Sequence, residues 1–212
     1  MQAISPTQEA ILRQAKRHFL RDGYKSASLR QIVKDAGFTQ GAFYGYYRSK
    51  EELFCALVED TTQGIVDLLM SIAADMDRWP AEERMLHMNE CYLRRLPELV
   101  DYLDDRRDEV ELLLKKSEGT RYEDYLGRIQ TMSQTGTTER IRSASSPLPL
   151  SPAALQEIMN AYYTAVFRIL LQGLPRAEML EAMIEVQKFW QYGMMGFLEL
   201  SAGQAKERRE DD

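Results

Sequence analysis

Residues 28–53, SLRQIVKDAGFTQGAFYGYYRSKEEL, constrain the fold of this chain more than any other stretch, because they contain three helix starts. Ser28, Thr39 and Ser49 are of the residue types that cap a helix N-terminus by accepting a hydrogen bond from a backbone N–H group. Gly37 lies between the first two caps, and glycine is suited to ending a helix in a left-handed backbone conformation. The stretch therefore predicts two short helices joined by a tight turn, followed by the start of a third helix.

The remaining sequence predicts helices as well. Ser5-Pro6 and Ser151-Pro152 each combine a capping serine with a proline at the first helical position. No segment alternates apolar and polar residues with a period of two over the length of a strand. The sequence therefore predicts an all-α fold of about nine helices. They are expected at residues 6–22, 29–36, 40–44, 50–77, 81–104, 105–116, 122–143, 152–172 and 176–202, with a frayed charged tail after them.

The charge of the chain is distributed unevenly. The whole chain has a net charge of -6, whereas residues 1–50 hold nine Lys and Arg against three Asp and Glu, a local charge of +6 that leaves -12 for the remainder. This asymmetry suggests a basic head that binds a polyanion, carried on an acidic body that the same polyanion repels. A solvated charged face on an ordinary protein would explain the charge count equally well.

Composition limits the class of protein. The hydrophobic content of 44% and the charged content of 28% are ordinary for a folded soluble protein. No run approaches the roughly 18 apolar residues that span a bilayer, and the N-terminus lacks the pattern of a secretory signal. Cys55 and Cys91 have no partner spacing, which argues against a disulfide framework or a cysteine-rich metal site. A cytoplasmic protein without membrane contact is expected.

The segment after Gly37 has the properties of a helix that enters the major groove of DNA. Gly41 and Ala42 are unusual in so short a helix, since glycine costs about 1 kcal/mol there, and they suit a helix whose backbone must approach another surface. Gln40 could bind an adenine edge and Arg30 a guanine. The alternative is that the capping residues only cap and the tyrosines are only core; each residue taken alone favours that alternative, and the combination favours DNA.

These residues resemble the DNA-binding domain of the TetR family of bacterial transcriptional repressors. The resemblance covers residues 5–65, with the helix-turn-helix at about 28–47. It rests on the Ser28 cap, the Ala36-Gly37 turn, Gly41 with Tyr44 and Tyr47, and the Lys50-Glu51-Glu52-Leu53 helix start. Position 46 is often histidine in this family and position 47 is usually phenylalanine. Tyr46 keeps a side chain that can form hydrogen bonds at its end. The Tyr47 hydroxyl could face either solvent or DNA.

The resemblance implies a ligand-released repressor that binds double-stranded DNA. It implies base contacts from Arg30, Thr39, Gln40 and Ala42, with Gly41 allowing close approach, and phosphate contacts from Ser28, Tyr44, Tyr46 and Lys50. The expected DNA-binding residues are Ser28, Arg30, Thr39, Gln40, Gly41, Ala42, Tyr44, Tyr46 and Lys50.

The body, residues 66–212, would then serve dimerisation and effector binding. One head reads one half-site, so two heads must be held at a fixed spacing, as in a two-fold dimer. The resemblance implies dimerisation through the last two helices; a monomeric core is the alternative. The expected interface residues are Tyr162, Ala165, Val166, Ile169, Trp190, Met194 and Phe197. A pocket for an unknown small-molecule effector is expected among Met85, Met88, Tyr92, Tyr122, Tyr125 and Met132, which could also be plain core.

Catalytic chemistry finds no support in the sequence. His18 and His87 lack a metal-ligating companion at helical spacing, and there is no glycine-rich phosphate loop or nucleophile elbow. No catalytic residue, metal or cofactor is therefore expected. The competing function is a helical dimer that binds a ligand or a partner and has lost the ability to read DNA.

Overall fold

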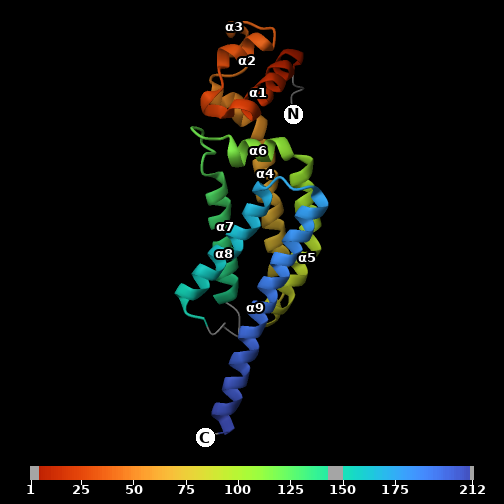
Figure 1. Cartoon of the computed structure of the whole chain (residues 1–212), viewed down its shortest axis with the longest axis vertical. Helices are drawn as coiled ribbons and strands as arrows, with labels where there is room; N and C mark the ends of the chain where they lie inside the picture. Colours follow the sequence, from red (N-terminus) through yellow and green to blue (C-terminus); the bar gives the residue numbers. More distant parts are fainter. Residues whose placement is uncertain (1–4, 143–149, 211–212) are drawn as a thin grey trace. The chain divides into compact units, whose positions relative to one another are not determined.

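The computed structural model describes residues 5–142 and 150–210, although not the side chains of residues 81, 82, 84–86 and 198–210. Within these residues the chain forms nine α-helices and no strand, which confirms the predicted all-α fold (Figure 1). The helices are α1 (Pro6–Ser26), α2 (Leu29–Asp35), α3 (Gln40–Tyr44), α4 (Lys50–Asp77), α5 (Ala81–Asp105), α6 (Arg107–Lys115), α7 (Tyr125–Arg142), α8 (Pro152–Leu171) and α9 (Arg176–Glu210).

The chain divides into two compact units. Unit 1 consists of Met1–Ile65 and Asp105–Leu126, and unit 2 of Val66–Asp104 and Gly127–Asp212. The sequence pattern had assigned residues 105–126 to the second region, together with residues 66–104. In the structure α6 packs on α1, which puts this segment in the unit that contains the helix-turn-helix.

Unit 1 is built around an aromatic core. Phe54 of α4 is fully buried, and its ring lies 5.3 Å from that of Phe19, 5.5 Å from that of Tyr24 and 6.5 Å from that of Tyr122, measured between centroids. Aromatic rings at such distances gain energy beyond the area that they bury. Tyr122 comes from the segment after α6, so this segment contributes directly to the core of the unit.

Polar contacts reinforce the attachment of the same segment. Lys16 of α1 forms an ion pair with Glu109 of α6 at 2.5 Å, and Lys25 forms one with Glu118 at 2.5 Å. The backbone N–H of Tyr24 donates to the carbonyl of Lys116 at 2.9 Å. Exposed ion pairs contribute little by themselves, so the buried rings carry most of the stability of this attachment and the ion pairs fix its register.

Three apolar clusters lie among the described residues of unit 2. One joins α7, α8 and α9 around Met159 and Trp190, a second joins α4 to α5 around Met76 and Met88, and a third joins α5, α8 and α9 around Val100. No helix in the described residues has a stretch long and apolar enough to cross a bilayer. Helices that are amphipathic, rather than apolar all round, pack one face into such clusters and leave the other exposed.

Several helix ends differ from the prediction. α1 continues to Ser26 through a kink at Gly23, whose φ of 76° and ψ of 160° are not helical, so the predicted end is the position of the kink. α7 begins at Tyr125 instead of residue 122, because the Ser117 and Thr120 hydroxyls hydrogen-bond the preceding turns. α9 extends to Glu210, where a frayed tail was expected; Ala, Lys, Glu and Arg are all strong helix formers.

Candidate nucleic-acid interface

The helix-turn-helix consists of α2, the turn at Gly37 and α3. The Ser28 hydroxyl oxygen accepts a hydrogen bond from the backbone N–H of Gln31 at 3.4 Å, and that of Thr39 accepts one from Ala42 at 3.2 Å. Gly37 has a φ of 84°, in the left-handed region. The predicted caps and turn are therefore confirmed. Since each hydroxyl acts here as an acceptor, its hydrogen remains available to donate to a phosphate.

The expected base-reading side chains are exposed on this frame. Arg30 and Gln40 are exposed, and Ala42 is half-buried. Tyr44 is 57% exposed and Tyr46 41% exposed, high values for aromatic residues. A side chain added at Gly41 would meet only the Thr39 hydroxyl oxygen, at 3.7 Å. The fold itself has room for a Cβ there, so the packing of the unit does not explain the glycine.

A hollow of about 540 Å³ lies between α2 and the start of α3. It is lined by Arg30, Val33, Lys34, Phe38 and Gln40. Lys34 was not among the expected DNA-binding residues. It follows Arg30 by four positions, the spacing that places two side chains on the same helix face, so helical periodicity applied to Arg30 would have found it. The charged Arg30 and Lys34 side chains can bind a phosphate, and the Gln40 amide can hydrogen-bond the edge of a base beside it.

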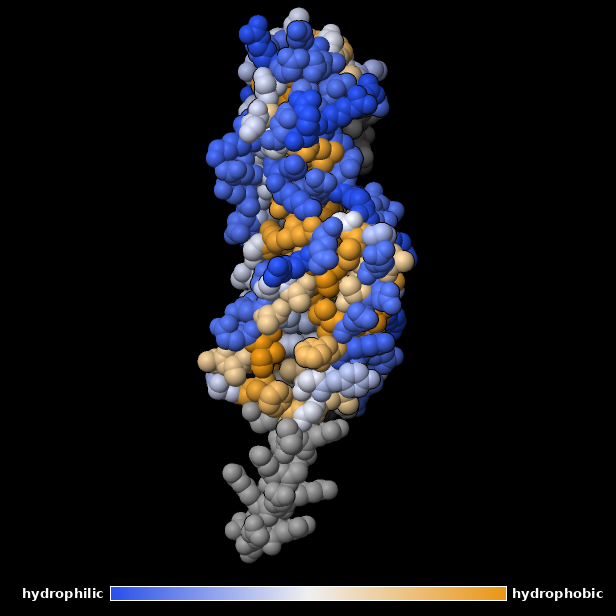
Figure 2. All heavy atoms as spheres, viewed as in Figure 1, coloured by the Kyte–Doolittle hydropathy of each residue, from blue (hydrophilic) through white to orange (hydrophobic). Residues whose placement is uncertain are grey.

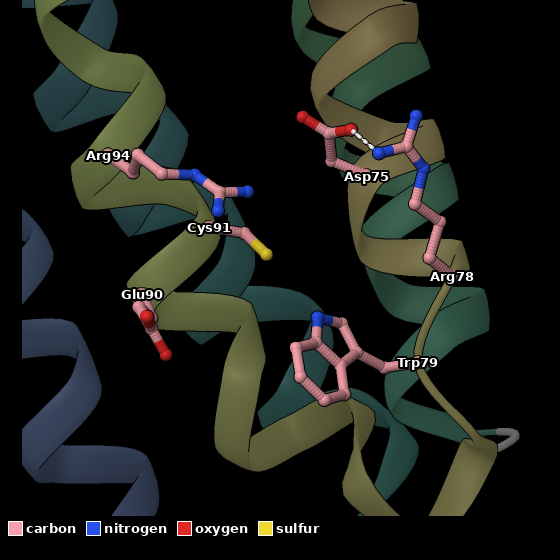
Figure 3. Close-up of a pocket in the computed structure, with 6 residues that line it drawn as sticks. All are labelled: Asp75, Arg78, Trp79, Glu90, Cys91 and Arg94. Carbon is pink, nitrogen blue, oxygen red and sulfur yellow. Dashed lines mark ion pairs between the residues drawn. The ribbon is translucent and has the colours of Figure 1, made fainter.

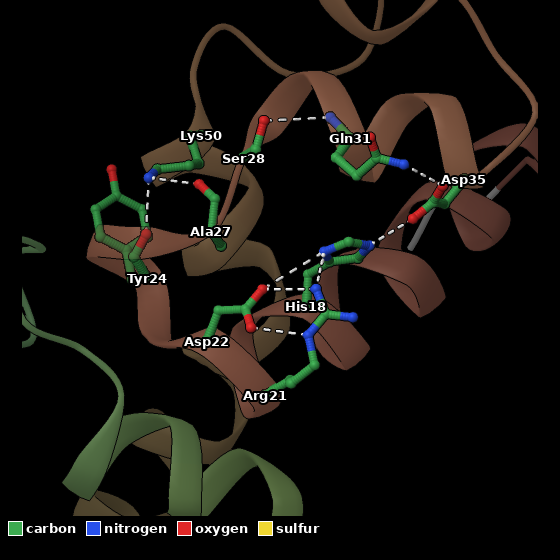
Figure 4. A network of polar contacts seen from close by, with 9 residues as sticks. All are labelled: His18, Arg21, Asp22, Tyr24, Ala27, Ser28, Gln31, Asp35 and Lys50. Atoms are coloured by element: carbon green, nitrogen blue, oxygen red, sulfur yellow. Dashed lines mark hydrogen bonds and ion pairs between the residues drawn. The ribbon is translucent and has the colours of Figure 1, made fainter.

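Lys50 has partners of its own within the protein (Figure 4). Its ammonium group donates to the backbone carbonyl of Tyr24 at 2.7 Å and to that of Ala27 at 3.0 Å. It also lies over the Tyr24 ring, 4.3 Å from the centroid. Burial lowers the pKa of this ammonium from its usual 10.5. Lys50 therefore satisfies carbonyl groups at the end of α1, and a phosphate contact from it would have to compete with these bonds.

A buried histidine links α1 to α2. His18 is 4% exposed, and its Nε2 donates to a carboxylate oxygen of Asp35 at 2.8 Å, while its Nδ1 accepts from Arg21 at 3.1 Å (Figure 4). Gln31 donates to the other Asp35 oxygen at 2.6 Å. The hydrogen bonds from His18 and then Gln31 hold the pKa of the Asp35 carboxyl below its usual 3.8. This arrangement fixes the acidic end of α2 against α1, a role that the sequence did not indicate.

Tyr47 provides a prediction about stability. Its side chain is 3% exposed, and its hydroxyl has no hydrogen-bond partner among the described residues, although Gln8 approaches it. Burial raises the pKa of this hydroxyl above its usual 10.0. Tyr47→Phe would remove a buried hydroxyl that makes no bond, so we expect the free energy of unfolding to rise by about 1 kcal/mol in urea denaturation. A loss of about 1 kcal/mol or more would show that the hydroxyl has a partner.

The expected effector residues divide between the two units. Tyr122 and Tyr125 belong to unit 1, where their rings lie 6.2 Å apart and the Tyr125 hydroxyl donates to the carbonyl of Thr62. Met88 and Tyr92 pack with the α4–α5 cluster of unit 2. Met132 is half-buried on α7, and the Met85 side chain lies outside the described residues. The sequence could not distinguish a pocket from core, because both require the same apolar side chains.

The expected dimer residues differ in how far the protomer itself buries them. Trp190 is 9% exposed and Met194 5% exposed; both pack inside the protomer against α8. Ile169 is also buried in the protomer, whereas Tyr162, Ala165 and Val166 are half-buried. Of the seven, Phe197 is exposed, at 38%. Because α9 is apolar on two sides, its sequence pattern did not distinguish the side that the protomer buries from the side that it exposes.

The outward face of α9 carries other large apolar side chains. Phe189 is 84% exposed, Tyr192 70% and Met195 41%. A Cβ added at Gly193 or Gly196 would meet nothing within 4 Å. Figure 2 shows apolar residues at the surface of unit 2 over α8 and α9, in contrast to the largely hydrophilic surface of unit 1. We call Phe189, Tyr192, Gly193, Met195, Gly196 and Phe197 the α9 face.

Comparison with known proteins agrees with this geometry. Residues 11–57 match the family model described as bacterial regulatory proteins, tetR family. A segment of 54 residues is 41% identical to an uncharacterized HTH-type transcriptional regulator, YdgC, of Bacillus subtilis. The N-terminal part of the chain, residues 11–57, belongs to the TetR family. The resemblance stated from the sequence is thereby confirmed.

Other TetR-family matches extend further along the chain. The HTH-type transcriptional repressor AcnR of Corynebacterium diphtheriae is 29% identical over 117 residues, 48% of this chain and 62% of the repressor. The match to YdgC covers 26% of this chain and 28% of that regulator. The chain thus spans less than two thirds of the length of these relatives.

The TetR fold extends over most of the chain. A TetR-like transcriptional regulator from Rhodococcus superposes with a TM-score of 0.60 at 16% identity, over 88% of this chain and 93% of that protein. A TetR-family regulator from Syntrophomonas wolfei superposes with a TM-score of 0.58 at 17% identity, over 89% and 96%. At such identities the likeness concerns the fold alone.

Proposed function

We propose that this TetR-family chain is a sequence-specific DNA-binding repressor, which acts as a homodimer on a palindromic operator and is released by a small-molecule effector. The observation that carries the proposal is the exposure of Arg30, Gln40, Tyr44 and Tyr46 around a helix-turn-helix whose two helix caps are formed by other side chains. Side chains that the fold does not need are then available for DNA. Base edges would be read by Arg30 and Gln40 in the major groove, and phosphates bound by the two tyrosine hydroxyls.

Phosphate binding depends on the charge of this head. Arg30 and Lys34 border the hollow between α2 and α3, and Asp35, the acidic residue beside them, is bound by His18 and Gln31. A carboxylate with two hydrogen-bond donors of its own competes less for the basic side chains that surround it. DNA affinity should therefore fall steeply as the salt concentration rises, because binding to phosphates releases counterions from the DNA.

Release by an effector is supported by likeness to other proteins. SmeT, which shares this fold with a TM-score of 0.53 at 20% identity, was solved as a complex with triclosan. The relatives named as repressors support the direction of control. A ligand would release DNA by binding more tightly to the form of the dimer that does not fit the operator, and only by that difference in affinity.

Gln40→Ala tests the proposal directly. We expect operator affinity to fall about tenfold or more, since a good contact to a base pair discriminates by about 1–3 kcal/mol. Affinity for random duplex DNA should stay the same, because Gln40 carries no charge. The measurement is a mobility shift on the DNA upstream of the chain's own gene, alongside a scrambled duplex of equal length.

Lys115→Gln, at an exposed position on α6 of the same unit, is the matched control and should bind as the unaltered protein does. If the unaltered protein binds operator and scrambled duplex equally, it does not read sequence, and the proposal fails in favour of a helical dimer that binds a ligand or a partner. If Gln40→Ala weakens both duplexes alike, the assignment of Gln40 to a base is wrong.

A further inference from the structure

Unit 2 contains a hollow of about 340 Å³ between the end of α4 and the first half of α5, lined by Asp75, Arg78, Trp79, Glu90, Cys91 and Arg94. Trp79 projects from the loop between α4 and α5, and Cys91 and Arg94 project from α5 into the same space (Figure 3). The hollow is separate from the helix-turn-helix. Of the residues expected to bind an effector, Met88 and Tyr92 belong to the same α4–α5 cluster as Cys91, so the hollow adjoins them. Its volume is at the lower end of the range of small-molecule sites, which suits a ligand with one ring.

Trp79 offers an aromatic surface held in place. Its indole stacks on the imidazole of His87, with centroids 3.6 Å apart and an angle of 12° between the planes. The residue nevertheless remains 36% exposed, and it contributes to the wall of the hollow. A ring fixed on one face by a stacked partner loses little freedom when a second planar group packs against it.

Both acidic groups of the hollow have a basic side chain beside them, and the imidazole beside Glu90 carries a charge only when it is protonated. The Asp75 carboxylate is bound by Arg78 at 3.2 Å and by Arg95 of α5. Glu90 lies 3.6 Å from the His87 imidazole. Arg94, by contrast, has no acidic partner in the part of the chain that the structure describes. Its guanidinium is therefore the charged group of the lining that can bind an anion without first breaking an ion pair.

We infer that this hollow binds a small planar carboxylate with a single aromatic ring. The carboxylate would accept two parallel hydrogen bonds from the Arg94 guanidinium, whose fork matches that geometry. The ring would pack against the Trp79 indole, and the buried Cys91 thiol would supply a soft apolar wall. Benzoate is the simplest molecule with these features and is the probe for the site.

The test measures benzoate binding by titration calorimetry on the whole protein in the absence of DNA, at constant ionic strength. Trp79 and Trp190 are the two tryptophans of the chain, so the fluorescence of a Trp190→Phe protein reports on Trp79 as a second readout. We expect saturable binding, with quenching of Trp79. Benzyl alcohol, which keeps the ring and lacks the charge, should bind about tenfold more weakly or worse.

Arg94→Gln should weaken benzoate binding at least about tenfold, because it removes the charge-assisted pair and keeps a polar side chain. Arg168→Gln, at an exposed position on α8, is the matched control and should leave benzoate binding unchanged. Circular dichroism checks that each variant is folded. Absence of saturable binding to the unaltered protein, or equal binding to Arg94→Gln, would overturn the inference. Because no DNA is present, either outcome leaves the proposed DNA binding standing.

Discussion

Phe189→Arg combined with Tyr192→Arg is expected to convert the proposed homodimer to a monomer in sedimentation experiments. Both side chains lie on the α9 face and are largely exposed in the protomer, so the substitutions remove apolar contact area between copies without disturbing the protomer's own core. Two like-charged copies of a two-fold patch would also repel each other. Operator affinity should then fall by about two to four orders of magnitude, because linked heads gain that much from an intramolecular second contact.

The glycines of the α9 face point to the same surface. A Cβ at Gly193 or at Gly196 would have no neighbouring atom of the protomer within 4 Å, although glycine costs about 1 kcal/mol in a helix interior. Packing within the protomer does not explain glycine at these positions. The close approach of a helix from a second copy would explain it. Large exposed apolar patches of this kind are typical of interaction sites.

Met70→Arg is the control for the dimer prediction. Met70 is 57% exposed on α4, so it tests whether any arginine at an exposed apolar position prevents association. It should remain a dimer and keep its affinity for the operator. If the double variant sediments as a dimer with its helicity intact, the α9 face is not the interface. Trp190 is unsuitable for the same test, because arginine there would disrupt the cluster that holds α8 to α9.

Phe54→Ala is expected to lower the free energy of unfolding of unit 1 by about 3–5 kcal/mol. The ring is fully buried and contacts the rings of three other residues. Its removal leaves a cavity that the surrounding aromatic rings, being rigid, fill poorly. Urea denaturation gives the size of the loss, and amide hydrogen exchange shows whether the protection lost lies within unit 1.

The segment around Tyr122 should respond together with the helix-turn-helix. Because Tyr122 shares the ring cluster with Phe54, exchange should accelerate in residues 105–126 as well as in α1. Met70→Ala, at the exposed α4 position, should change stability by less than about 0.5 kcal/mol. A loss of less than about 1 kcal/mol for Phe54→Ala, or acceleration confined to the first 65 residues, would contradict the assignment of residues 105–126 to the core of unit 1.

The local structure of the helix-turn-helix could be predicted from its residue types. Ser28 and Thr39 each bond a backbone N–H three residues ahead, and Gly37 takes the positive φ that a tight turn requires. Such interactions join residues that are close in the sequence, so their residue types can be recognised within a short stretch of it. The same property made the family recognisable, since its motif consists of these local signals.

The partners of residues that are distant in the sequence became known only from the packing of the helices. Lys50 binds carbonyl groups more than twenty positions away, residues 105–126 join unit 1, and α9 buries Trp190 while it exposes Phe189. Nothing within a short window records these choices, because an apolar stripe on two sides of a helix can bury either side, and a lysine can bind a phosphate or a carbonyl equally well. The choice depends on the packing of the remaining helices, and that packing is a property of the whole chain.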